Sequence, residues 1–111
     1  MLDRNAETRL FRDNPKNIAA HLSGAFAEND LAAIMAAINR VMLAQNVKAL
    51  ARESGLRREG LYRTFGGEID PLLSRVLALF DALGVRITIE ALPSRKIPPR
   101  PKLGRPRKTV E

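Results

Sequence analysis

Hydrophobic side chains recur every three to four positions through much of residues 15–83, and this spacing is typical of amphipathic helices. Three longer helices are predicted, over residues 15–28, 31–44 and 71–83. The first carries one apolar face, made by Ile18, Leu22, Ala25 and Phe26. The second is apolar nearly all round, so we expect it at the centre of the domain, with one side available for a dimer interface.

Polar cap residues mark where these helices begin. Asn14-Pro15 and Asp70-Pro71 each pair an N-cap residue with a proline at the first helical position, where its missing N–H is no loss. Asn29-Asp30 caps the second helix, and Gly84 ends the third. Residues 1–13 show no sustained period and are predicted to be a flexible lead-in, either loose or a short helix.

Residues 47–65 have the spacing of two short helices joined by a turn. Gly55 can take the positive φ that a sharp turn needs, and Ala51 is small enough to let the helices cross closely. The residues expected to point inward are Leu50, Ala51, Leu56, Leu61 and Phe65. This pattern favours a DNA-binding helix-turn-helix, with a plain helical hairpin carrying solvated arginines as the alternative. Gly60 interrupts the second helix on its outer side, which indicates close approach by a partner.

The outward positions of this segment are mainly basic. In a helix-turn-helix the second helix enters the major groove, where arginine binds guanine and a carboxylate can accept from cytosine. The base-facing candidates are Arg57, Arg58, Glu59, Tyr62 and Arg63. Lys48 and Arg52, on the first helix, are expected to contact phosphates instead.

Residues 85–90 change the period from 3.6 to 2. Val85, Ile87 and Ile89 then fall on one side and polar residues on the other, which predicts a short β-strand. A single strand needs a partner for its backbone groups. That partner is either a second copy of the chain or another protein, and the alternative is an edge segment packed on the last helix.

The charge is concentrated at the C-terminal end. The net charge of the chain is +7. Residues 1–90 contain 12 Lys+Arg and 11 Asp+Glu and contribute only +1, whereas residues 91–111 contain 7 Lys+Arg and 1 Asp+Glu and contribute +6. The chain therefore divides into the lead-in 1–13, a domain at 14–92 and a proline-rich, disordered basic tail at 93–111, which favours a polyanion partner.

The tail resembles an AT-hook, a minor-groove-binding arm, with Leu103 where an arginine is usual; a nonspecific basic tail is the alternative. Its candidate residues are Lys102, Gly104, Arg105, Pro106, Arg107 and Lys108.

The sequence lacks the residues that several classes of function require. There is no cysteine, and the lone His21 has no partner for a catalytic dyad or a zinc site, so we expect no enzyme, no cofactor and no metal. His21 is interpreted as a surface or boundary side chain. The first residues lack the apolar run of a signal peptide, and the longest apolar run is too short to span a bilayer, which needs about 20 residues. We expect a soluble cytoplasmic protein, associated with the nucleoid and not with a membrane.

The segment LARESGLRREGLYRTF, followed by a capped helix ending in LFDALGVRITIEAL, resembles the antidote (antitoxin) proteins of addiction modules over about residues 14–92. The resemblance implies an all-α, five-helix domain with a phage-repressor-like helix-turn-helix, binding to its own operator, and a complex with a small ribosome-dependent RNA-cleaving toxin. Arg57 stands where the family often has serine, and Gly60 replaces a usual alanine. The proline-rich tail is not an expected family feature.

These observations predict a sequence-specific, homodimeric DNA-binding regulator, the antitoxin of a toxin-antitoxin module that represses its own operon. Two alternatives stay open. One is a stand-alone regulator or nucleoid-associated DNA binder that uses the tail. The other is a protein-interaction module with incidental DNA contact.

Overall fold

The computed structural model describes residues 4–66, 69–92 and 98–101, and within these it is all-helical. The described residues form six helices. They are α1 (Arg4–Phe11), α2 (Pro15–Ala27), α3 (Leu31–Leu43), α4 (Val47–Ser54), α5 (Arg58–Thr64) and α6 (Leu73–Leu83). The all-α class is confirmed, and the count of five is not, because α1 precedes the five predicted helices.

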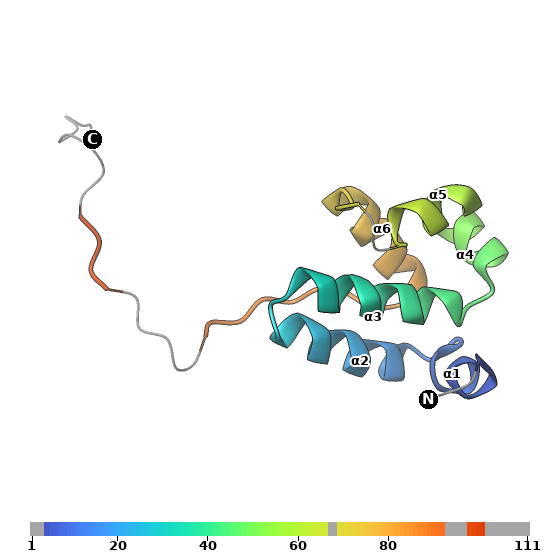
Figure 1. Ribbon diagram of the computed structural model, residues 1–111, viewed down its shortest axis with the longest axis horizontal. Coiled ribbons are helices and arrows are strands. Elements are labelled where there is room, and N and C mark those ends of the chain that lie inside the picture. Colours follow the sequence, from blue (N-terminus) through green and yellow to red (C-terminus); the bar gives the residue numbers. More distant parts are fainter. Residues whose placement is uncertain (1–3, 67–68, 93–97, 102–111) are drawn as a thin grey trace.

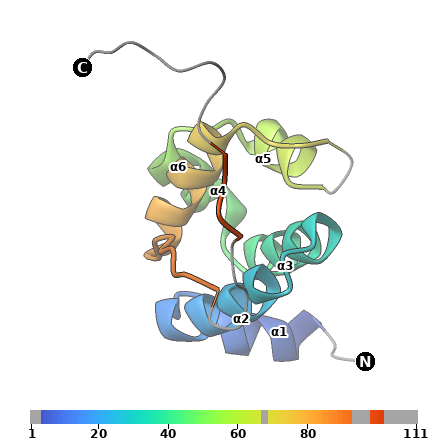
Figure 2. The same ribbon diagram turned by 90° about the vertical axis from the view of Figure 1, so that its left-hand side faces the viewer.

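Two groups of helices share one core. α2 and α3 run side by side with α1 at one end, and α4, α5 and α6 lie on the other side of α3 (Figure 1). The view along the long axis shows α5 and α1 on opposite sides of the molecule (Figure 2). The rings of Phe26 and Phe80 meet edge to face, 6.2 Å apart, and so join α2 to α6. The fully buried side chains come from four helices and the residue after α5: Ile18, Ile38, Val41, Met42, Leu61, Phe65 and Leu79.

Side-chain caps begin three helices. The Asn14 side chain accepts a hydrogen bond from the N–H of Asn17 (3.2 Å), and the Asp30 carboxylate accepts one from Ala33 (2.9 Å). Both caps were predicted. Asn46 caps α4 in the same way, and the sequence reasoning missed it. Each cap satisfies an N–H that has no partner inside its helix.

The predicted cap at Asp70-Pro71 is wrong. α6 begins at Leu73, and Leu72 occupies the N-cap position with extended backbone (φ −66°, ψ 142°) and no side-chain cap bond. Pro71 therefore lies before the helix. The other end is as predicted: Gly84 takes φ 83°, and the Val85 N–H donates to the Phe80 carbonyl at 3.0 Å. This left-handed residue turns the chain out of α6 at little steric cost.

α1 is attached to the domain by polar and apolar contacts. Phe11 is buried in the core, and Arg40 Nε lies 2.9 Å from the Glu7 carboxylate. The Gln45 side chain donates to the Phe11 carbonyl (2.9 Å) and accepts from the Asp13 N–H (3.1 Å), so the segment between α3 and α4 holds the corner between α1 and α2. Of the two alternatives for the lead-in, residues 4–11 form the short helix.

The predicted β-strand at residues 85–90 is not confirmed. Residues 85–92 form no strand, and the part of the chain that the structure describes contains no second segment to pair with them. Val85 packs against the core, Ile87 is partly exposed and Ile89 is 95% exposed. The alternation of apolar and polar residues is present, but a strand also requires backbone partners, and the described part of the chain supplies none.

Candidate nucleic-acid interface

α4 and α5 are joined by the tight turn expected of a helix-turn-helix. Gly55 has φ 76°, in the left-handed region, and ends α4. The Ser54 hydroxyl supports the turn, since its O–H donates to the Ala51 carbonyl and its oxygen accepts from the Leu56 N–H, both at 3.3 Å. The two helices contact each other, and Leu50 and Ala51 are buried on the inner face of α4.

The inner face of α5 is firmly held. Leu61 and Phe65 are completely buried, Thr64 is buried beside them, and Leu56 packs against the same core. The Asn39 side chain of α3 donates a 2.9 Å hydrogen bond to the Phe65 carbonyl. The predicted inward residues therefore all lie where the spacing placed them, and α5 has one fixed orientation.

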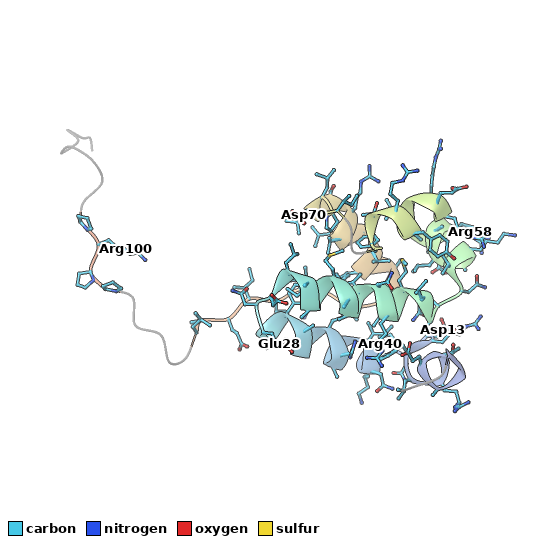
Figure 3. All side chains as sticks on the ribbon, in the orientation of Figure 1. Asp13, Glu28, Arg40, Arg58, Asp70 and Arg100 are labelled. Atoms are coloured by element: carbon cyan, nitrogen blue, oxygen red, sulfur yellow. The ribbon has the colours of Figure 1, made fainter. Side chains whose placement is uncertain are left out.

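The seven candidate DNA-contacting residues that precede the tail all lie on the exposed side of α4 and α5. Lys48, Arg52, Arg57, Arg58, Glu59, Tyr62 and Arg63 are exposed. Tyr62 is 43% exposed, so its ring is partly supported by the protein. In the described part of the chain none of the seven is in an ion pair within 4.0 Å. Figure 3 shows Arg58 at the beginning of α5, extending away from the body of the domain.

α5 begins without a side-chain cap. Arg57 is its N-cap residue, with extended backbone (φ −73°, ψ 147°) and no side-chain cap bond. Arginine has no acceptor atom to offer the first N–H groups of a helix. The expected loss of a capping side chain at this position is confirmed.

Gly60 is not required by the fold. A β-carbon built there would meet only the Arg57 β-carbon, at 3.7 Å, which is an ordinary van der Waals distance. Its φ is not in the left-handed region, and a glycine inside a helix costs about 1 kcal/mol relative to alanine. Intramolecular packing and backbone strain therefore do not explain this glycine.

A cleft of about 620 Å³, with several charged side chains on its walls, lies between α5 and the segment that leads into α6. Arg57, Glu59 and Arg63 line it from the α5 side, and Asp70 and Arg75 from the other. Figure 3 shows Asp70 on this second side. Arg75 was not predicted as a site residue. Its signal was available, since it is the one basic residue of the helix from 71 to 83 and lies off that helix's apolar stripe.

His21 lies outside this surface. Its ring centroid lies 5.0 Å from that of Phe11, the residue is half-buried, and its Nε2 is buried with no hydrogen-bond partner among the described residues. Burial lowers the pKa of His21, the positive charge of Arg40 lowers it further, and Glu7 opposes the shift. The boundary position predicted for His21 is confirmed.

The six candidate tail residues, Lys102 to Lys108 without Leu103, lie outside the described residues. Among the helices that the structure describes, none has the length and apolar character needed to cross a membrane.

The fold and the candidate site define a class of protein: a small domain, all-helical in its described residues, in which two short helices joined by a tight turn present an exposed basic surface. Residues 5–91 match the family described as probable addiction module antidote protein, and the chain belongs to that family. Membership indicates an antitoxin role, with a toxin as partner.

One curated relative is an uncharacterized protein of Haemophilus influenzae. It is 27% identical over 75 residues, which cover 68% of this chain and 77% of that protein. No solved structure matches the chain.

Proposed function

We propose that the chain is an antitoxin that binds the DNA upstream of its own gene through α5, represses its operon, and neutralises a small RNA-cleaving toxin. The observation that supports DNA binding best is the exposed surface of α4 and α5. It carries five cationic side chains and two carboxylates, Glu53 and Glu59, and none of these groups is in an ion pair with another described residue. A solvated cationic surface on a firmly packed helix suits a polyanion.

The residues divide into two roles. Arg57, Arg58, Glu59, Tyr62 and Arg63 face base edges in the major groove, where bidentate arginine–guanine contacts supply sequence preference. Lys48 and Arg52 bind backbone phosphates and set the register. Lys102 to Lys108, without Leu103, form the minor-groove arm of the tail, which adds affinity at A·T-rich flanks.

One domain contacts little DNA, so the functional unit is a homodimer that reads two half-sites about one helical turn apart. Residues 85–92 remain the candidate segment for pairing with a second copy or with the toxin. Their support is the exposure of Ile87, Ile89 and Leu92 on backbone that belongs to no helix.

The first experiment is fluorescence anisotropy of the full chain with its own upstream DNA, over a salt series and with an unrelated duplex as competitor. The test variant is Arg58→Ala/Arg63→Ala. The matched control is Arg9→Ala/Arg12→Ala, which removes the same charge from exposed residues at α1, on the opposite side from α5 (Figure 2). We expect the test variant to lose its preference for the upstream duplex and the control to keep it.

A toxin-binding measurement distinguishes loss of DNA recognition from loss of toxin neutralisation. Both variants should still bind the product of the adjacent reading frame in size-exclusion chromatography, because neither changes residues 85–92. If the test variant binds upstream DNA like the control, α5 is not the reading element. A chain ending at Leu92 is also measured. If it still prefers the upstream duplex and its affinity depends less on salt, the tail contributes only phosphate contacts.

A further inference from the structure

The cleft between α5 and the segment leading into α6 has arginines on both walls. Arg57 and Arg63 belong to the α5 wall, and Arg75, on the first turn of α6, belongs to the other. All three are exposed. Glu59 and Asp70 line the same cleft, but neither lies within 4.0 Å of any of the three guanidinium groups. The cleft therefore holds three positive charges that form no ion pair with any other residue that the structure describes.

The position of Arg75 does not serve α6 itself. A cation in the first turn of a helix opposes the partial positive charge at that end, where acidic residues are favoured. α6 has no acidic residue in its first turn and no side-chain cap. Arg75 also makes no described ion pair with a neighbouring carboxylate. An external anion would remove this electrostatic conflict.

The shape and charge of the cleft suit a phosphate of a nucleic-acid backbone. Guanidinium groups bind phosphate oxygens through two parallel N–H bonds, and several of them together concentrate negative charge. The cleft opens along the exposed side of α5, and three of the residues assigned to the bases, Arg57, Glu59 and Arg63, also line it. A DNA strand lying along α5 would pass its backbone over this opening.

We propose that Arg75 binds a backbone phosphate of the DNA from the α6 side of this cleft, opposite Arg57 and Arg63. This contact holds the strand between α5 and α6 and fixes how far α5 enters the groove. It carries no base preference of its own. The inference rests on the proposed DNA-binding function, and it assigns a phosphate contact to an element outside the helix-turn-helix.

The test is anisotropy of the full-chain variant Arg75→Gln with the upstream duplex and with an unrelated duplex. The control is Arg12→Gln, an exposed arginine on the far side of the domain. We expect Arg75→Gln to weaken binding to both duplexes by a similar factor, about three- to tenfold at moderate salt, and to reduce the salt slope by about 1. Arg75→Lys keeps the positive charge but loses the planar guanidinium that donates two parallel N–H bonds. This variant should recover part of the lost DNA affinity. Circular dichroism checks that each variant is folded.

The outcomes are distinguishable. If Arg75→Gln binds like wild type while Arg58→Ala/Arg63→Ala loses the upstream preference, the Arg75 contact is wrong and the proposed function stands. A loss confined to the upstream duplex would make Arg75 a base contact and overturn the phosphate role. If wild type binds neither duplex, both proposals fail.

A thermal-unfolding series distinguishes DNA from free phosphate. It compares inorganic phosphate with chloride at matched ionic strength. Stabilisation by phosphate that Arg75→Gln abolishes, together with unchanged DNA binding, would assign the cleft to a free phosphate and overturn the DNA contact. We expect no such combination.

Discussion

The Asn39 side chain donates a 2.9 Å hydrogen bond to the carbonyl of Phe65 and so joins the middle of α3 to the residue that ends α5. That carbonyl is a group left without an intrahelical partner at the end of a short helix. Phe65 itself is fully buried, so the bond and the ring together fix the end of the exposed basic helix.

Replacing Asn39 should affect both stability and DNA recognition. We expect Asn39→Ala to lower the free energy of unfolding by about 1 kcal/mol, since a partly buried hydrogen bond is lost. DNA preference should fall as well, because α5 loses one of its supports. The measurements are urea denaturation and anisotropy.

Asn17→Ala is the matched control for this prediction. Its side chain donates to the Leu10 carbonyl at 2.8 Å, between α1 and α2 and away from α5. We expect a comparable change in stability and no change in DNA preference. Equal effects of the two variants on DNA binding would mean that Asn39 acts only through global stability.

Arg57→Ser should stabilise the domain and weaken DNA binding. Serine at the N-cap supplies the side-chain acceptor that α5 lacks, which is worth about 1 kcal/mol. The same change removes a candidate base contact. An increase in the denaturation midpoint with a lower affinity for the upstream duplex is expected. A stabilised variant with unchanged affinity would remove Arg57 from the interface.

Gly60→Ala tests whether DNA approaches the α5 backbone. Alanine should stabilise the helix by about 1 kcal/mol, because the added methyl group meets only the Arg57 β-carbon at 3.7 Å. We expect DNA affinity to fall nevertheless, because the methyl group points to the exposed side of the helix. Gly24→Ala, on α2 with nothing within 4 Å of its β-carbon, is the control. It should stabilise similarly and leave DNA binding alone; if both variants bind DNA like wild type, close approach at Gly60 is excluded.

Stability should depend on pH through His21. Burial and Arg40 lower the pKa of His21 below its usual 6.5, so the native state favours the neutral ring. In the unfolded chain the ring takes up a proton as the pH falls through about 6.5. His21 therefore contributes a stability that is complete above that pH and decreases below it, until the folded-state pKa is passed.

Urea denaturation between pH 7.5 and pH 5.5 measures this dependence. His21→Phe keeps an aromatic ring beside Phe11 and removes the titrating group. We expect the decrease in the free energy of unfolding on acidification to be smaller in this variant. An identical pH dependence in the two proteins would assign the effect to other groups.

The local elements were predictable because their causes are local. The caps at Asn14 and Asp30, the left-handed Gly55, the glycine end of α6 and the buried positions of α5 follow from residue type and spacing over a few neighbours. The exposed position of Arg57, Arg58 and Arg63 follows from the same helical period. The sequence alone therefore determined the starts of the three longer helices within two residues, the presence of two short helices within residues 47–65, and which side of α5 faces solvent.

Contacts between distant residues decided the rest. α1 is held by the ion pair between Glu7 and Arg40 and by the hydrogen bond from the Gln45 side chain to the Phe11 carbonyl. The two residues of each pair are more than 30 positions apart, so no local pattern indicates these contacts. Arg75 joins the α5 arginines around one cleft only because α6 packs against α4, which in turn packs against α5. The alternation at residues 85–90 was not enough to predict a strand. A strand forms only when its backbone hydrogen-bonds to another segment, and the pattern within residues 85–90 does not show whether such a segment is present.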